Sequence, residues 1–257
     1  MKALLIDGMN LVRRVHAAVP GDEGTLEHFE GALESTLNSL RRALNEHEPT
    51  HAVCAFDAGG RTWRHEIFPD YKLDRLPMPE QLRLNLHRVV AAIENLGVRC
   101  LSVPGVEADD VLATIAVKTA ARDGRVVILS TDKSMCQLAG DRIRIRDHFA
   151  ARELDVAYIE DKFGVAPSQL ACLLGLMGDK SLNVPGVKSI GARTAAKLIN
   201  EYGTLENMLA NAETIPGRPG KALIAEAAQA RLSVALVRLK TDVSIGINLS
   251  QLRWRSS

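Results

Sequence analysis

The sequence lacks the cysteine pairs and long apolar runs that mark disulfide-rich, zinc-binding or membrane-spanning proteins. Its four cysteines, Cys54, Cys100, Cys136 and Cys172, form no C-x-x-C pair and lie among apolar neighbours. This pattern favours buried free thiols in a reducing compartment. The apolar start of the chain is too short for a signal peptide, and no segment reaches the ~20 residues of a membrane span. We therefore expect a cytoplasmic protein with no membrane partner.

A strong net charge is also lacking, because 32 Lys and Arg stand against 31 Asp and Glu. The charge is nevertheless unevenly distributed. Residues 1–160 hold 20 basic and 24 acidic side chains, whereas residues 161–257 hold 12 and 7. An acidic part followed by a basic part suits a protein that holds a cation in one region and an anion in the other.

Three carboxylates, Glu107, Asp109 and Asp110, stand within four residues at the start of an expected helix. One Asp there would cap the helix. Three acids are too many for a cap, because two like charges ~4 Å apart repel each other by ~4 kcal/mol at an effective dielectric near 20. The fully ionised cluster is stable only if a cation lies within it. Without a cation, some of the acids must be protonated. We interpret it as a divalent metal site.

Four short apolar segments, at 3–6, 51–56, 99–103 and 126–130, are predicted strands, with a fifth at an edge around 143–145. Helical patterns at 25–46 and 79–95 lie between them. Strands that alternate with helices predict an α/β fold with a doubly wound, mainly parallel sheet.

Acidic residues follow the predicted strands, at the point where each strand ends. Because the carboxyl ends of parallel strands meet at one edge, these side chains should share one crevice. Carboxylate oxygens are the ligands that Mg²⁺ or Mn²⁺ prefers. The residues expected in this crevice are Asp7, Asp57, Glu107, Asp109, Asp110 and Asp132.

The connection at 61–80 is long and carries Arg64, Lys72 and Arg75 with Trp63 and Tyr71 interleaved. Connections of this length are usually functional or disordered. Cations beside aromatics suit a phosphate backbone with stacked bases. The alternative is a solvated basic loop.

After about residue 157 the strand signals stop, and residues 161–257 are expected to be helical. A helix at 170–177 precedes a Pro185–Gly186 turn, and a further helix begins after Gly191. Free N–H groups at that helix start, with lysine and arginine beside them, are typical of a phosphate site that contacts no base. The alternative is an ordinary corner between two helices.

Taken together, these segments resemble the 5′-nuclease (flap endonuclease) superfamily, with its PIN-like core, over residues 1 to about 240. They resemble most closely the bacterial exonuclease IX-type flap endonucleases. The matching segments, in order, are Asp7-Gly8, Phe56-Asp57, Arg64-His65 with Tyr71-Lys72 and Arg75, Glu107-Ala108-Asp109-Asp110, Thr131-Asp132-Lys133, Gly178-Asp179, and Val184-Pro185-Gly186 through Ile190-Gly191.

The resemblance implies hydrolysis of DNA phosphodiesters at 5′ flaps with two Mg²⁺ ions. It assigns catalytic roles to Lys72, Asp109 and Asp110, and the 61–80 segment to a short arch over single-stranded 5′ ends. The implied Mg²⁺ ligands are Asp7, Asp57, Glu107, Asp109, Asp110, Asp132 and Asp179. The residues expected at DNA are Arg64, Tyr71, Lys72, Arg75, Lys188, Ser189, Ile190, Gly191, Ala192, Arg193 and Thr194.

The resemblance also identifies the helical corner as a helix-three-turn-helix, whose main-chain carbonyls bind K⁺ in relatives. The implied carbonyls here are those of Leu176, Met177, Pro185, Val187 and Ile190. We expect an α/β metal-binding domain at 1–160, a helical DNA-binding region at 161–257, and a monomer.

Two positions depart from the family pattern. Ser134 and Leu182 stand where the family usually has acids of the second metal site. We therefore expect one resident ion and a second that is recruited weakly, with DNA. These losses also keep open the alternative of a flap-binding protein with little or no nuclease activity. A further alternative, a small PIN-type ribonuclease, shares the acidic sheet edge but does not account for the basic second half.

Overall fold

The computed structural model describes residues 1–254 and contains one six-stranded sheet in the order β3-β2-β1-β4-β5-β6. All neighbours pair in parallel except β5 and β6, which are antiparallel. This sheet confirms the expected doubly wound α/β fold. The strands are β1 (Lys2–Asp7), β2 (His51–Ala55), β3 (Arg99–Leu101), β4 (Arg125–Leu129), β5 (Ile143–Asp147) and β6 (Arg152–Glu153).

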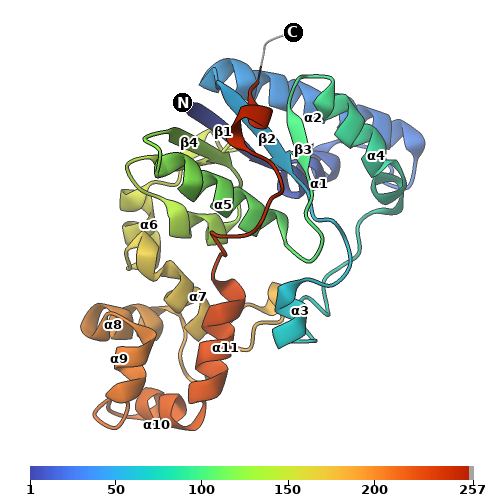
Figure 1. Ribbon diagram of the computed structural model, residues 1–257. Helices are drawn as coiled ribbons and strands as arrows, with labels where there is room; N and C mark the ends of the chain where they lie inside the picture. The colour runs from blue at the N-terminus through green and yellow to red at the C-terminus, as the bar shows by residue number, and fades with distance from the viewer. Residues whose placement is uncertain (255–257) are drawn as a thin grey trace.

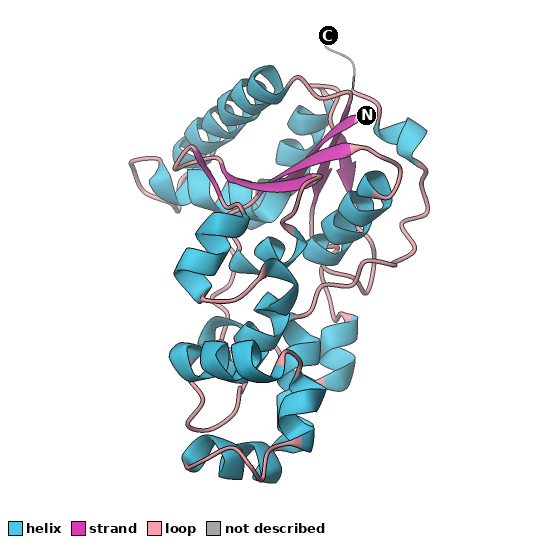
Figure 2. Ribbon diagram, turned by 90° about the vertical axis from the view of Figure 1, so that its left-hand side faces the viewer, coloured by secondary structure: helices cyan, strands magenta, loops and turns pink. Residues whose placement is uncertain are grey.

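Helices cover both faces of the sheet because alternate residues of each central strand point to opposite sides. Leu4 and Ile6 of β1 pack on one side, against a layer of three helices, while Ala3 and Leu5 face the other side and α5. Figures 1 and 2 show the sheet between these layers. The first layer contains α1 (Gly8–Ala18), α2 (Leu26–His47) and α4 (Glu80–Glu94); opposite lies α5 (Ala108–Ala120).

The rest of the chain forms a helical region below the sheet in Figure 1. Its buried side chains continue the core around α5 into the helical region without a break. The tail then returns to the sheet, where the Trp254 amide donates to the Thr50 carbonyl. The helices are α6 (Val156–Phe163), α7 (Leu170–Met177), α8 (Ala192–Tyr202), α9 (Leu205–Ala210), α10 (Arg218–Ala225) and α11 (Ala227–Val237).

Short elements join these parts. Helix α3 (Trp63–Ile67) begins the 61–80 segment, and the 3₁₀ turns η1 (Lys133–Leu138) and η3 (Lys180–Leu182) follow two of the expected metal ligands. The remaining 3₁₀ turns are η2 (Pro167–Gln169) and η4 (Leu249–Leu252).

The five expected strands and the helices at 25–46, 79–95 and 170–177 are all present. Two details differ. The fifth strand is not an edge, because the two-residue β6 pairs with it. Helix α1 was not anticipated, although Met9, Val12 and Val15 recur at helical spacing. The cysteines are free as expected; Cys100 is half-buried and the other three are buried.

Candidate metal centre

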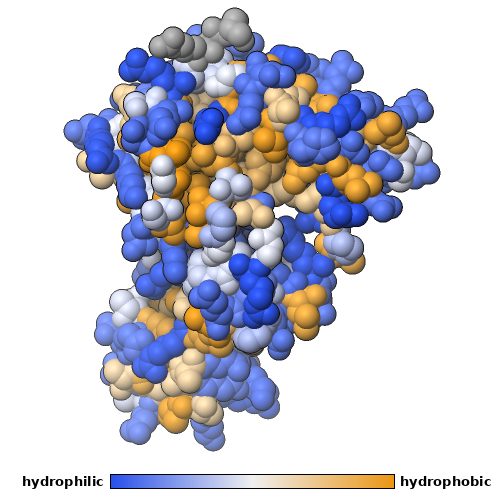
Figure 3. All heavy atoms as spheres, turned by 45° about the vertical axis from the view of Figure 1, so that its right-hand side comes forward, coloured by the Kyte–Doolittle hydropathy of each residue, from blue (hydrophilic) through white to orange (hydrophobic). Residues whose placement is uncertain are grey.

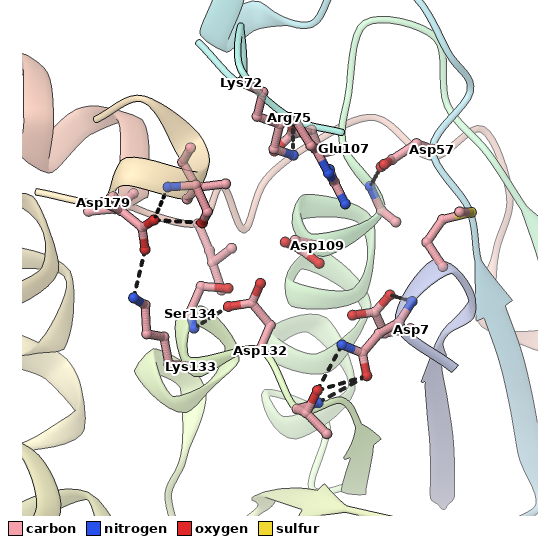
Figure 4. A pocket seen from close by; sticks show the side chains of 18 of the residues that line it. Asp7, Asp57, Lys72, Arg75, Glu107, Asp109, Asp132, Lys133, Ser134 and Asp179 are labelled. Atoms are coloured by element: carbon pink, nitrogen blue, oxygen red, sulfur yellow. Dashed lines mark hydrogen bonds and ion pairs between the residues drawn. The ribbon is translucent and has the colours of Figure 1, made fainter. Parts of the chain in front are cut away.

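Six carboxylates line one pocket of about 620 Å³ at the carboxyl ends of the parallel strands. They come from four separate strand ends and from the start of η3, as Figure 4 shows for their side chains. In Figure 3 the surface is hollowed between the α/β layers and the helical region, with hydrophilic residues around the hollow. The six are Asp7, Asp57, Glu107, Asp109, Asp132 and Asp179. Asp110 is not among them.

Asp7 is fixed by the junction between β1 and α1. Its side chain caps α1 by accepting from the Asn10 amide at 3.0 Å, and its second oxygen accepts from the Ser130 hydroxyl at 2.8 Å. The helix can begin so tightly only because the next residue is Gly8, where a Cβ would lie 2.7 Å from the Phe56 ring. Burial, together with the nearby charges of Asp132 and Asp57, raises the pKa of Asp7 to about 6, although the hydrogen bonds from Asn10 and Ser130 act in the opposite direction.

Asp109 lies in the first turn of α5 and points toward the middle of the pocket. Among the described residues, no hydrogen bond reaches its carboxylate. Burial, followed by the charges of Asp7 and Asp132, raises its pKa, while Lys72 lowers it. Asp57 follows the end of β2 and lies beside the start of α5, where one of its oxygens accepts from the Ala108 amide at 2.9 Å. In the described part of the chain, no hydrogen bond reaches the other oxygen of Asp57, which leaves it available to a cation.

Glu107 differs from the other five acids of the pocket because two cationic side chains contact it. Lys72 Nζ lies 2.6 Å from Oε1, and Arg64 Nη1 lies 3.0 Å from Oε2. The Tyr71 hydroxyl also donates to Oε2, at 3.2 Å. Three side chains of the 61–80 segment therefore converge on one carboxylate of the metal centre.

Asp110 turns away from the pocket, contrary to its expected place among the metal ligands. It is fully buried, and its oxygens accept from Arg64, from the Trp63 indole and from the Lys240 amide. Successive helical residues point ~100° apart, and here Asp109 faces the pocket while Asp110 faces Arg64. We leave Asp110 out of the proposed ligand and catalytic sets.

Arg64 and Tyr71 were expected at DNA but are 2% and 4% exposed. Arg64 pairs with Glu107 and Asp110, and it donates to the main-chain carbonyls of Leu236 and Arg238 at the end of α11. These contacts occupy both side chains within the protein. All four line the pocket, but the burial of Arg64 and Tyr71 fits supporting roles, whereas Lys72 is half-buried and Arg75 is exposed.

The side of the pocket expected to hold a second ion contains Asp132 and Asp179, and here a lysine pairs with one of these acids. Lys133 Nζ lies 2.6 Å from one oxygen of Asp179, and the other oxygen accepts from the amide and hydroxyl of Ser181. Burial would raise the pKa of Asp179, but these donors lower it below its ordinary value. Asp132 accepts from the Ser134 amide at 2.7 Å. The main-chain carbonyl of Leu182 accepts from the Lys72 amide, so this position now anchors the 61–80 segment.

The turn between α7 and α8 presents main-chain groups at its surface. Gly178 and Gly186 pack backbone to backbone, and a Cβ on Gly186 would meet the Gly178 nitrogen at 2.7 Å. Gly191 caps α8 without a side chain, which leaves the first amides of the helix open. Of the residues expected at DNA, Lys188, Ser189, Gly191, Ala192 and Arg193 are exposed, Thr194 is half-buried and Ile190 is buried.

The carbonyls expected to bind K⁺ occupy both sides of this turn. Those of Leu176 and Val187 each accept one amide hydrogen bond, from Val187 and Ile190 respectively. A carbonyl oxygen has a second lone pair that could still face a cation. For Met177, Pro185 and Ile190, the described residues supply no hydrogen bond to the carbonyl.

Several pocket residues escaped sequence reasoning. Arg13, Arg14 and Lys162 line the cavity beside the carboxylates, and Asn10 bonds to Thr131 across it. Three of these four lie on α1, which had not been recognised as a helix. Its apolar spacing could have revealed them, because it starts directly after Asp7.

The residues present fit a hydrated, hard divalent ion. All six acids offer oxygen ligands, and Asp109 has no protein donor within the described part of the chain. Within residues 1–254, no three His, Cys, Asp or Glu side chains are close enough together to form a ready-made cage. Mg²⁺ usually keeps several waters and takes only one or two carboxylates, so such a cage is not required.

The raised pKa of Asp7 predicts how metal binding and pH act on stability. Without a cation, a carboxyl whose pKa rises from 3.8 to about 6 on folding stabilises the folded state most below pH 4, and this contribution is lost as pH rises through 6. The shift corresponds to roughly 3 kcal/mol. We therefore expect the rise in Tm on adding Mg²⁺ to be larger at pH 8 than at pH 5, as measured by calorimetry. An Asp7→Asn variant should lose most of this difference; an equal rise at both pH values in wild type would contradict the prediction.

Comparison with known proteins agrees with this arrangement. A model of the 5′-3′ exonuclease N-terminal, resolvase-like domain matches residues 2–164, and one of the 5′-3′ exonuclease C-terminal SAM fold matches residues 165–257. None of the helices in residues 1–254 combines the length and hydropathy that a membrane span requires.

Individual relatives cover nearly the whole chain. Flap endonuclease Xni of Cronobacter sakazakii is 42% identical over 252 residues, which is 97% of each chain. Flap endonuclease Xni of Vibrio cholerae is 39% identical over 256 residues, covering 99% of this chain and 97% of that one. A structure of T5 5′-exonuclease with bound zinc shares the fold, with a TM-score of 0.81 at 22% identity over 94% of this chain and 90% of that one. The chain therefore belongs to the 5′-3′ exonuclease family, together with the bacterial flap endonucleases.

Proposed function

We propose that this protein is a structure-specific 5′ flap endonuclease that uses Mg²⁺, or Mn²⁺ in its place, to hydrolyse DNA at junctions between single strands and duplex. The observation that carries the proposal is the convergence of six carboxylates on one pocket that also contains Lys72 and Arg75. Acids alone would hold a cation; the two cations of the 61–80 segment add a place for the phosphate.

The acids of the first site are proposed to hold the divalent ion. Asp109 and Asp7 face the centre, Asp57 contributes its open oxygen, and Glu107 joins when the Lys72 contact is released. Such an ion supplies the Lewis acidity that phosphodiester hydrolysis requires. The hydrogen bonds from the buried Ser130 and from the Asn10 amide keep Asp7 oriented toward the pocket.

Lys72 is proposed to move between two partners. Here its ammonium neutralises Glu107 at 2.6 Å, from a backbone with φ +59°. A DNA phosphate that enters the pocket offers the ammonium a second anion, and Arg75 is exposed beside it. A positive φ is uncommon for a residue with a side chain as long as that of lysine. The hydrogen bond from the Lys72 amide to the Leu182 carbonyl helps to hold this backbone conformation.

The α7–α8 turn is proposed to grip duplex phosphates without reading bases, through open amides at Gly191 and the exposed Lys188 and Arg193. We propose K⁺ binding at the five carbonyls named above, which would add positive charge to the same surface. The division into an α/β metal domain (1–160) and a helical DNA-binding region (161–257) is part of this proposal, as are a monomeric state and a cytoplasmic location.

The role of the turn gives a measurable expectation for Arg193→Ala. Losing one phosphate contact should weaken binding to flap and to plain duplex DNA alike, and should reduce the slope of log K against log salt by about 1. Fluorescence anisotropy across 50–200 mM KCl measures both. The matched control is Arg41→Ala, which removes an exposed arginine on α2, distant from the turn in the sequence. It should change neither the affinity for DNA nor the salt slope. An unchanged slope in Arg193→Ala would remove the turn from the interface.

The function itself is tested with labelled 5′-flap, nicked and single-stranded DNA, incubated with and without Mg²⁺. The proposal predicts cutting at the flap junction only when Mg²⁺ is present. Tight flap binding with no cutting under any condition would instead support the alternative of a flap-binding protein, which the occupied oxygens of Asp179 favour.

A further inference from the structure

The pocket contains more basic than acidic side chains, so its carboxylates could be balanced in number without any metal. Six carboxylates line it, and seven basic side chains face them. These are Arg13, Arg14, Arg64, Lys72, Arg75, Lys133 and Lys162. The basic side chains are not spread evenly. Asp7, Asp57 and Asp109 have no ion pair among the described residues, whereas Glu107 and Asp179 each pair with a lysine at 2.6 Å.

The Lys133–Asp179 pair stands on the side of the pocket where the family pattern has two more acids. Lys133 comes from the first turn of η1 and Asp179 caps η3, so the pair joins elements 46 residues apart. Figure 4 shows the lysine extending from beside Asp132 to the Asp179 carboxylate. The side chain of Asp179 is 11% exposed, and every hydrogen bond it accepts comes from Lys133 or Ser181.

We propose that Lys133 is a built-in cation that occupies the position of the second divalent ion and keeps Asp179 from binding one. This inference rests on the proposed function and identifies what limits its metal requirement. A divalent ion at Asp179 would meet the positive charge of an ammonium in contact with the same carboxylate, and like charges this close repel strongly at a half-buried site. The Ser134 hydroxyl, buried without a hydrogen-bond partner in the described residues, offers only a neutral oxygen in compensation.

The effect of Lys133 on the second site can be distinguished from the effect of the missing acids. Weak binding of a second ion could follow merely from Ser134 and Leu182, which supply no charge. A blocking lysine makes a further prediction: removing its charge should strengthen the second site although the missing acids are not restored. The Lys133 side chain is 41% exposed and, within residues 1–254, its ammonium donates only to Asp179, so its removal leaves no buried donor unpaired.

The experiment counts bound Mn²⁺ by electron paramagnetic resonance on the purified full chain without DNA. Wild type should bind one Mn²⁺ well and a second at least tenfold more weakly. Lys133→Ala should tighten the second site about tenfold, whereas Lys133→Arg, which keeps the charge, should bind as wild type does. Adding Asp179→Asn to Lys133→Ala should abolish the gain, which locates the new ion at that carboxylate.

Two results would overturn the proposal: an unchanged second affinity in Lys133→Ala, or a gain that survives Asp179→Asn. Thermal melting of each variant without metal checks that the fold is intact. Because the readout is metal binding, it is independent of DNA cleavage. If the protein never cuts flap DNA but shows this pattern of Mn²⁺ binding, the proposed function is wrong and the built-in cation is supported. If it cuts flap DNA but Lys133→Ala leaves the second affinity unchanged, the function is supported and the built-in cation is wrong.

Discussion

Replacing Asp109 by alanine is expected to reduce flap cleavage by about 10³-fold or more while leaving flap binding within a few-fold of wild type. The loss corresponds to ~4 kcal/mol of transition-state stabilisation, a size typical of metal-ion catalysis. Asp109 should show the largest effect because it is the central carboxylate to which the described residues donate no hydrogen bond. Its removal therefore takes a ligand from the cation without breaking a contact of the fold.

The measurement is single-turnover cleavage of a 5′-flap substrate at saturating protein, with anisotropy for binding. Asp161→Ala removes an exposed acid on α6 and serves as the control; its rate should match that of wild type. Folding is checked by Tm, which should rise slightly in metal-free Asp109→Ala because a half-buried carboxyl that other acids repel is gone. Cleavage within tenfold of wild type would exclude Asp109 from the catalytic centre.

Arg64→Ala is expected to destabilise the protein by about 3–5 kcal/mol, the range for removing one partner of a buried ion pair. The change leaves the fully buried Asp110 without its main cation and leaves the Leu236 and Arg238 carbonyls without their donor. Since Arg64 also holds Glu107, cleavage should fall as well. Urea unfolding followed by circular dichroism measures the free energy.

Two further variants separate a buried ion pair from a simple packing loss. Arg61→Ala removes an exposed arginine of the same segment and should cost no more than ~0.5 kcal/mol. Arg64→Met combined with Asp110→Asn removes both charges, so it should be clearly less destabilising than Arg64→Met alone. A cost below ~1 kcal/mol for Arg64→Ala would show that the guanidinium does not tie the segment to α11.

The sequence was sufficient to predict the sheet and the acidic crevice, because both depend on local signals. Apolar strands ending in Asp7, Asp57 or Asp132 place carboxylates at one edge of any parallel sheet. Asp179 could be assigned only through the family resemblance, since it reaches the pocket from the helical region.

Side-chain direction and burial could not be predicted in the same way. Asp109 and Asp110 are chemically identical neighbours, and only the rotation of α5 against the sheet decides that one faces the pocket and the other Arg64. Arg64 and Tyr71 looked like DNA contacts because basic and aromatic residues alternate there. Their burial depends on Glu107 and on the end of α11, which lie far away in the sequence.

The most direct test of the central claim is the position of bound Mn²⁺ in crystals, measured by anomalous scattering. The claim is that acids from separate strand ends share one cation. We predict a single strong peak in the pocket, within direct or one-water contact of Asp7, Asp57 and Asp109. Saturating Mn²⁺ without a peak in this pocket, or with the ion held elsewhere on the chain, would contradict the claim.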